Sequence, residues 1–270
     1  MPQRFPFSAL KASLLAAWLA AALAACAPLP SSMQSSSASL LEASSAQAVV
    51  QPADGPLAVP PTLTSLVDPV GQGRLISAAS KQSYWPLSAY FETQKNEAYC
   101  SVATTVMALN ALGVQRPESS LYPGFPYFSQ DEFFRTIDPQ VANAARVSME
   151  GMTLDQLATA LTSFPVDVRK YHASDLTLAQ FRDLIRTTTA RNDRFVLLNF
   201  KRTAIGEVGG GHWSPLAAFD PATDTALLLD VARYKYPPVW VPVAQLYDGA
   251  LAVDSVSGLA RGLVIIGKPH

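Results

Sequence analysis

Residues 212–233 read HWSPLAAFDPATDTALLLDVAR, two apolar runs on either side of the polar segment DPATD at residues 220–224. Asp, Pro and Thr in that segment favour a turn, so the two runs are predicted to pair as an antiparallel hairpin. With the turn centred on Ala222, the numbers of paired residues add up to 444. His212 and Asp230 then lie on the same face as diagonal neighbours, whereas a slip of one residue would put them on opposite faces.

Two other short apolar runs in the C-terminal half also predict strands. They read FVLLNF at 195–200 and GLVII at 262–266, and runs of this length are typical of buried strands. Helical patterns occur earlier in the chain, between residues 100 and 190. Helices first and strands later predict an α+β fold rather than alternating β-α-β units.

The first of these helices is predicted over residues 100–112. Apolar residues recur there at intervals of three and four, and Gly113 suits a C-cap. Three further helices are expected to begin with capping boxes, in which a Ser or Thr is followed three residues later by Glu or Gln. The pairs are Ser129 with Glu132, Thr153 with Gln156, and Thr177 with Gln180.

Residues 1–26 have the features of a lipoprotein signal peptide. Arg4 and Lys11 supply positive charge, and an apolar run then ends in LAAC, a lipobox pattern whose Cys26 would carry the lipid. The alternative is an ordinary secretory signal beside a chance cysteine. A lipidated Cys26 would hold the protein on the non-cytoplasmic side of a bacterial membrane, in the periplasm, with an outer-membrane location where a second membrane exists.

Residues 27–70 are rich in Ser, Ala, Pro and Gln and are expected to form a flexible tether. Residues 71–270 are expected to form one folded catalytic domain. The formal net charge is −1 and no basic patch is found, so nucleic acid is not an expected partner. The sequence contains no CxxC, HExxH or GxSxG motif, which disfavours a zinc site and a hydrolase-type serine nucleophile.

Cys100 is the only cysteine after residue 26. Exported proteins use most cysteines in disulfides, and Cys100 has no partner if Cys26 is lipidated. It is therefore either a small buried apolar residue or a nucleophile. Its place at the start of a helix favours the thiolate, because the helix dipole and free N–H groups stabilise negative charge there.

His212 is the histidine expected to act with Cys100, because His172 and His270 are expected to be solvated. The residue types Cys100, His212 and Asp230 supply a nucleophile, a general base and a carboxylate that orients the base. Gln94 is a candidate donor to an oxyanion. A strand-end cap is the alternative role for Asp230. The glycine run 209–211 ends at His212, and Gly211 is expected to let the backbone approach a substrate.

Three stretches around these residues resemble the phytochelatin synthase family, a branch of the papain-like cysteine peptidase clan. They read PLSAYFETQKNEAYCSVATTVMALNALG, GEVGGGHWSPLAAFD and LLLDVARYKYPPVWVP, and the similarity extends over about 85–267. The resemblance implies a papain-like fold, with the cysteine in a helical half and the histidine and aspartate in an antiparallel sheet half. It assigns the catalytic roles to Cys100, His212, Asp230 and Gln94.

The same resemblance assigns substrate contacts to Arg202, Asp254 and Arg261. Without it, the arginines would be read as surface salt-bridge partners. It implies that glutathione is the substrate, that glycine is released, and that a γ-glutamylcysteinyl thioester is passed to water or to a second glutathione. It further implies no built-in cofactor or metal, with heavy-metal ions entering as glutathione thiolates, and it is compatible with a homodimer. The alternatives are a papain-like peptidase or amidase for another peptide, and an inert tethered protein that binds peptides or metal–thiol complexes.

Overall fold

The computed structural model describes residues 55–269. The predictions for Cys26, for the remainder of residues 1–54 and for His270 lie outside the described residues. Within 55–269, seven strands form one sheet in the order β1-β6-β5-β4-β3-β7-β2. Every neighbouring pair is antiparallel. The mixture of helices with an antiparallel sheet confirms the α+β prediction.

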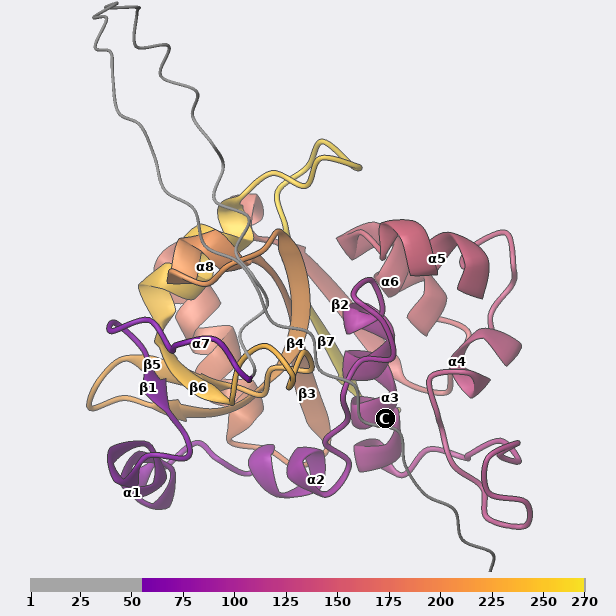
Figure 1. Ribbon diagram of the computed structural model, residues 1–270, viewed down its shortest axis with the longest axis horizontal. Coiled ribbons are helices and arrows are strands. Elements are labelled where there is room, and N and C mark those ends of the chain that lie inside the picture. The colour runs from indigo at the N-terminus through magenta and orange to yellow at the C-terminus, as the bar shows by residue number, and fades with distance from the viewer. Residues whose placement is uncertain (1–54, 270) are drawn as a thin grey trace, which may run out of the picture. The chain divides into compact units, whose positions relative to one another are not determined.

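The helices and strands carry the labels used in Figure 1. The strands are β1 (Thr64–Ser65), β2 (Asp167–His172), β3 (Arg194–Lys201), β4 (Gly211–Asp220), β5 (Thr225–Leu228), β6 (Val239–Pro242) and β7 (Gly262–Gly267). The α-helices are α1 (Pro69–Ser77), α2 (Tyr84–Ala89), α3 (Cys100–Leu112), α4 (Glu132–Arg135), α5 (Ala144–Glu150), α6 (Leu154–Leu161), α7 (Leu178–Thr189) and α8 (Val243–Leu251). Two 3₁₀ turns are η1 (Ala173–Asp175) and η2 (Arg202–Ile205).

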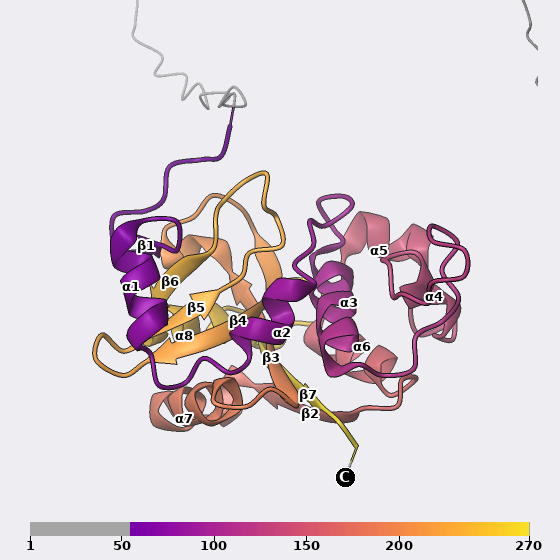
Figure 2. The ribbon, with the colours of Figure 1, turned by 90° about the horizontal axis from the view of Figure 1, so that it is seen from below.

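The sheet is covered on both faces, which explains why β3 is almost continuously apolar. Phe195 and Leu197 pack into the cluster that contains α3 and α6, whereas Val196, Leu198 and Phe200 pack with α7 and α8. Alternate side chains of one strand point to opposite faces, so a strand buried on both sides needs apolar residues throughout. Helices α3–α6 gather on one side of the fold, away from β1, β5 and β6 (Figures 1 and 2).

The helix predicted over residues 100–112 is confirmed as α3. Gly113 adopts the left-handed C-cap conformation with φ 65°, as its lack of a Cβ allows. The capping boxes of Thr153 and Thr177 are both present. The box predicted at Ser129 is wrong: α4 has only four residues, and the Ser129 hydroxyl donates to the Glu132 carboxylate.

The hairpin of β4 and β5 is confirmed, but its register differs from the prediction near the turn. Asp220 pairs with Thr225, so the turn spans 221–224 and is not centred on Ala222. A β-bulge at Ala217 adds one residue to β4, after which Leu216 pairs with Leu228 in the predicted register. Strand β5 ends at Leu228 instead of continuing to residue 233.

The bulge decides which residues share a face. Ala217 and Ala218 both pack into the cluster around α3, so the inward and outward pattern of β4 reverses between them. His212 and Asp230 therefore lie on the same face, as predicted. Without the bulge, the register at the turn would have placed them on opposite faces.

Sheet contacts begin earlier than residue 71, the boundary expected from composition. Thr64 pairs with Trp240 in β6, and the Leu57 backbone N–H donates to Lys235 O at 2.8 Å. These contacts place at least part of residues 55–70 in the folded unit. None of the helices between residues 55 and 269 is both long enough and apolar enough to span a membrane.

Candidate active site

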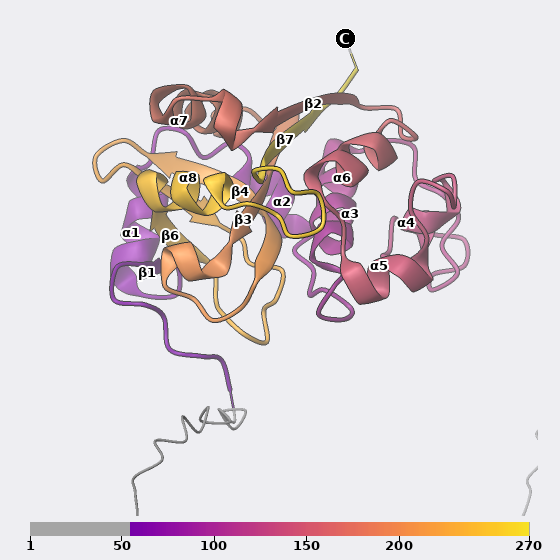
Figure 3. The same cartoon turned by 90° about the horizontal axis from the view of Figure 1, so that it is seen from above.

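Cys100 and His212 line the same cleft, which has a volume of about 510 Å³. One wall is built by the start of α3 and the junction of α5 with α6, and the other by β4 and the segment after α8. Figure 3 shows that segment reaching toward α5 and α6. The Trp213 indole N–H donates to Met152 O at 2.9 Å and thereby ties the α5–α6 junction to β4.

Cys100 is the first residue of α3, and only 7% of its surface is exposed. Burial raises the pKa of its thiol, although the backbone N–H groups of Trp213 and Ser101 and the charge of Arg202 act in the opposite direction. The expectation of a favoured thiolate at this helix start is therefore wrong for the free protein. Burial outweighs the helix terminus, because a thiolate loses its hydration there. Cys100 rests as a neutral thiol.

His212 is held through one ring nitrogen. Its Nε2–H donates to Asp230 Oδ1 at 2.9 Å, and the Ser214 hydroxyl lies 3.0 Å from the same nitrogen. Burial lowers the pKa of His212 despite the negative charge of Asp230, so the imidazole is neutral at rest. Neither of these hydrogen bonds uses Nδ1, so the ring keeps a second nitrogen that can accept a proton.

Asp230 follows β5 and is fully buried. Besides His212, its oxygens accept hydrogen bonds from Arg202 Nη1 at 2.6 Å, Arg202 Nη2 at 2.9 Å and the Ala232 backbone N–H at 2.8 Å. Burial alone would raise the pKa of Asp230, but the charges and hydrogen bonds of His212 and Arg202 hold it well below its usual range. Asp230 is therefore a carboxylate that orients His212, rather than a strand-end cap alone.

Arg202 lies at the start of η2 with 3% of its surface exposed. Its guanidinium is occupied by Asp230 and by Glu207, and it lies 5.5 Å from the centre of the Tyr236 ring. The guanidinium fork already holds two carboxylates, so the contact of Arg202 with substrate stays a prediction. The arrangement makes Arg202 a positioning residue for Asp230.

Gln94 is joined to the sheet by its backbone N–H, which donates to Val231 O at 2.9 Å. Its side-chain amide donates to Asn96 O at 2.8 Å and to the Tyr234 hydroxyl at 3.1 Å. Gln94 lines a smaller hollow with His212, on which Cys100 does not border. The oxyanion role therefore stays a prediction, and it requires the amide to release Tyr234.

Asp254 and Arg261 bring opposite charges into the cleft that holds Cys100. Arg261 Nη1 lies 2.7 Å from Asp254 Oδ2 and donates to Asn199 Oδ1 at 2.9 Å. Gly211 makes this possible, because a Cβ on it would lie only 2.3 Å from Arg261 Nη1. Gly211 thus lets the Arg261 guanidinium lie close to the backbone of β4.

His172, expected to be solvated, is instead partly buried at the end of β2. Its Nδ1 lies 2.6 Å from Ala260 O, and its Nε2 lies 3.3 Å from Asp155 Oδ1. It anchors the residue that precedes Arg261. Roles for Ser214 and Glu207 are not predictable from the sequence, because neither residue belongs to a motif. Each reaches the site through a contact that the tertiary fold creates.

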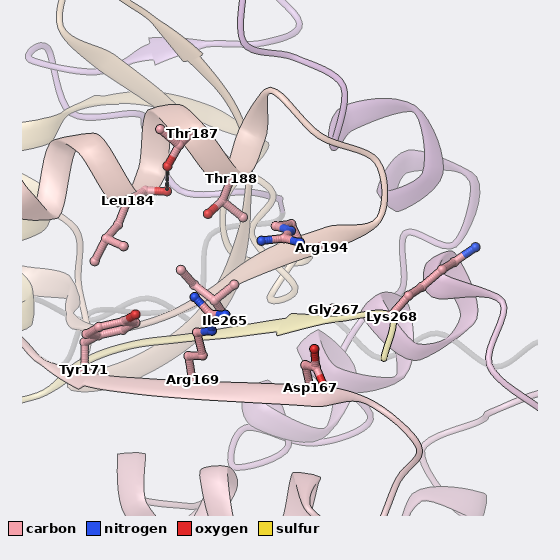
Figure 4. Close-up of a pocket in the computed structure, with 10 residues that line it drawn as sticks. All are labelled: Asp167, Arg169, Tyr171, Leu184, Thr187, Thr188, Arg194, Ile265, Gly267 and Lys268. Atoms are coloured by element: carbon pink, nitrogen blue, oxygen red, sulfur yellow. Dashed lines mark hydrogen bonds between the residues drawn. The ribbon is translucent and has the colours of Figure 1, made fainter. Parts of the chain in front are cut away.

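A second hollow, of about 120 Å³, lies between β2, β7 and the end of α7 (Figure 4). Arg169, Arg194 and Lys268 line it, together with Asp167 and two threonines of α7, but no cysteine or histidine does. Among the residues the structure describes, no group of three or more His, Cys, Asp or Glu side chains is arranged to hold a metal ion. Of the cleft and the two hollows described here, only the cleft is lined by a cysteine.

The family model of phytochelatin synthase matches residues 55–263, which contain the whole cleft. The chain belongs to the phytochelatin synthase family. Glutathione gamma-glutamylcysteinyltransferase 3 of Lotus japonicus is 30% identical to it over 202 residues, which are 75% of this chain and 40% of the relative.

Two further relatives carry the same name. Glutathione gamma-glutamylcysteinyltransferase 1 of Arabidopsis thaliana is 27% identical over 208 residues, 74% of this chain and 41% of the relative. The enzyme of that name from Schizosaccharomyces pombe is 28% identical over 202 residues, 73% of this chain and 46% of the relative. The chain spans less than half the length of these three relatives.

Proposed function

We propose that this protein is a thiol acyltransferase that acts on glutathione and releases its glycine. The observation that carries the proposal is the shared cleft, in which Cys100 and His212 lie with the Asp254–Arg261 ion pair. The names of the relatives support glutathione as the γ-glutamylcysteine donor. On this proposal the fold is papain-like, with the nucleophile on α3 and the base on β4.

In the proposed reaction, His212 Nδ1 takes the proton of the Cys100 thiol, and the sulfur attacks the carbonyl carbon of the Cys–Gly bond. Asp230 stabilises the imidazolium through Nε2–H. The imidazolium then protonates the leaving glycine nitrogen, and a γ-glutamylcysteinyl thioester remains on Cys100. Water or the amino group of a second glutathione attacks this thioester, and His212 takes the proton of that nucleophile.

The Asp254–Arg261 pair is suited to the free amino-acid end of the γ-glutamyl group. That end is a zwitterion at neutral pH, so its ammonium would face Asp254 and its carboxylate would face Arg261. Arg261 Nε is buried and has no hydrogen-bond partner among the described residues, which leaves a donor available. An ordinary peptide has neither charge at the corresponding place, so the pair would discriminate in favour of glutathione.

The test is to incubate purified protein with glutathione and to measure free glycine. We expect release by the wild type and none above background by Cys100→Ala, with His212→Ala similarly inactive. Equal release by Cys100→Ala would contradict the proposal. A panel of ordinary peptides tests the alternative, and a preference for those peptides would favour a general peptidase. An inert protein would release nothing from any of them.

We also propose that heavy-metal ions enter as glutathione thiolates, since a metal–thiolate is part of the substrate and requires no resident metal site. Adding cadmium to the same reaction should then raise the yield of γ-Glu-Cys-extended peptides relative to γ-Glu-Cys. No change in that ratio would contradict the role of the metal. Size-exclusion chromatography with light scattering tests the proposed homodimer.

A lipid anchor at Cys26 remains a proposal from the sequence. Expression of the full chain in a bacterium with two membranes should place the wild type in the membrane fraction. Cys26→Ser should then be recovered unprocessed or in another fraction. Recovery of both proteins in the soluble periplasmic fraction would contradict the anchor.

A further inference from the structure

Glu207 is a buried carboxylate that the proposed chemistry does not use. It lies in the connection between η2 and β4, and 2% of its surface is exposed. It does not border the Cys100 cleft, so it has no access to a substrate bound there. Its backbone N–H donates to Arg202 O at 3.1 Å, and its carboxylate accepts a hydrogen bond from Arg202 Nη1. These two hydrogen bonds link Glu207 back to Arg202.

Arg202 is shared between two carboxylates. Its Nη1 contacts both Glu207 and Asp230, and its Nη2 contacts Asp230 alone. With Asp230 as its sole partner, Arg202 would cancel the negative charge that faces His212. The positive charge of Arg202 does lower the pKa of His212. With the Glu207 carboxylate included, Arg202, Asp230 and Glu207 together carry a net negative charge, which favours the protonated form of His212.

We propose that Glu207 is a positioning residue that holds Arg202 and neutralises it, so that Asp230 remains free to stabilise protonated His212. This inference rests on the proposed function only in the roles of Cys100 and His212, not in the choice of substrate. Glu207 acts through Arg202 and Asp230 and touches none of the reacting atoms. Its charge should therefore change how readily His212 takes the Cys100 proton.

The charged surroundings of Glu207 make this effect dependent on pH. Burial raises the pKa of Glu207 to about 7, and Asp230 acts in the same direction, whereas Arg202 and Lys235 lower it. The Tyr236 ring packs on Arg202, and its hydroxyl accepts the Val208 N–H at 2.9 Å. Above neutral pH the carboxylate is charged and supports His212, and below it the support is lost.

The experiment compares wild type with Glu207→Gln, which keeps the shape and removes the charge. Both full-length proteins are treated with iodoacetamide from pH 5.5 to 8.5, and mass spectrometry of the Cys100 peptide gives a rate separate from that of Cys26. We expect equal rates at pH 5.5 and a wild-type rate about three- to tenfold higher at pH 8, since a pKa change of one unit is tenfold in an equilibrium. If the ratio of the wild-type rate to the Glu207→Gln rate does not change with pH, the inference is overturned.

Two variants separate charge from structure. Tyr236→Phe removes the acceptor of the Val208 N–H without changing any charge, so its rate relative to wild type should not vary with pH. Glu118→Gln, at an exposed carboxylate after α3, should match wild type throughout. If Glu207→Gln does not fold, the wild-type profile decides, since it must show an inflection near pH 7 below the thiol ionisation. A single ionisation would contradict the inference.

The outcome is independent of the substrate. A pH-dependent rate ratio without glycine release would refute glutathione as substrate and support the role of Glu207. Glycine release with a constant rate ratio would support the proposed function and refute the role of Glu207.

Discussion

At the scale of single residues, burial sets the resting state of the site. The Cys100 thiol and the His212 imidazole are both neutral, because each would lose hydration on becoming charged. In the proposed reaction the Cys100–His212 ion pair therefore forms only when the proton moves, with Asp230 already charged beside His212. The sequence placed Cys100 at a helix start correctly, but depth below the surface is a property of packing that a local pattern does not contain.

Gln94 offers a test of oxyanion stabilisation at this scale. We expect Gln94→Ala to lower kcat for glycine release by about 100-fold, the cost typical of one lost oxyanion donor. Alkylation of Cys100 should change little, because it develops no oxyanion. Tyr234→Phe, which removes one acceptor of the Gln94 amide, should retain activity. Equal losses of alkylation and glycine release in Gln94→Ala would instead show that Gln94 supports the structure around Cys100.

Gly211 and Gly210 form a matched pair for the substrate contacts. A Cβ at Gly211 would displace the Arg261 guanidinium, whereas a Cβ at Gly210 meets no atom within 4 Å. We expect Gly211→Ala to raise KM for glutathione by about tenfold, a typical effect of losing a hydrogen bond to a charged group. Gly210→Ala should leave KM unchanged. Steady-state kinetics with a melting curve for each variant checks this, and an equal KM in both would contradict it.

At the scale of elements, the sequence predicts what is local and repeats. The caps of α6 and α7, the end of α3 and the central strands all follow from adjacent residues. Strands β1 and β6 are not predicted from the sequence. They have two and four residues, which is too short to show an alternating pattern of apolar and polar side chains. The bulge was missed because Ala217 and Ala218 look alike, and either fits a buried strand. The Arg202–Glu207 contact was missed because salt-bridge partners are chosen by tertiary packing.

The capping box of α7 makes a prediction for stability. Thr177 accepts the Gln180 N–H at 3.2 Å, so Thr177→Ala should cost about 1 kcal/mol of unfolding free energy. Thr187 is exposed in the same helix, and among the described residues its hydroxyl donates only to backbone oxygens of that helix. Thr187→Ala should be neutral or slightly stabilising, since Ala is the better helix former. Urea unfolding of both variants tests this, and equal losses would contradict the cap.

At the scale of the whole molecule, the candidate site draws on both faces of the sheet. Cys100 begins α3, which packs on one face, whereas His212 pairs with Phe200, which packs in the apolar cluster of α7 and α8 on the other face. The connection 202–210 contributes Arg202 and Glu207 to a buried charge cluster with Asp230. Unfolding exposes every member of that cluster, so overall stability should depend on pH through it.

The raised pKa of Glu207 makes the folded protein less stable as the pH rises. Its pKa of about 7 in the folded protein exceeds the ordinary value near 4.3, so the folded state binds the extra proton between these values. Stability from this group is therefore full below pH 4 and falls as pH rises to 7, by up to about 3 kcal/mol. The lowered pKa of His212 acts oppositely up to about pH 6.5, where the unfolded imidazole loses its proton.

Comparison with Glu207→Gln isolates the carboxylate, because His212 is present in both proteins. We expect the unfolding free energy of wild type, relative to the variant, to fall between pH 5 and pH 7.5. Urea unfolding at several pH values measures the difference. A difference that stays constant with pH would show that Glu207 is ionised in the folded protein throughout.

The bulge at Ala217 determines whether the number of residues between paired positions of the hairpin is odd or even. Leu216 and Leu228 are partners, and the eleven residues 217–227 between them are an odd number. A four-residue turn with an unbroken ladder would make that number even, so the bulge supplies the odd residue. A turn of three or five residues without a bulge would orient His212 and Asp230 in the same way. Loop exchange in this hairpin therefore has to change its length in steps of two, or add and remove the bulge together with one turn residue.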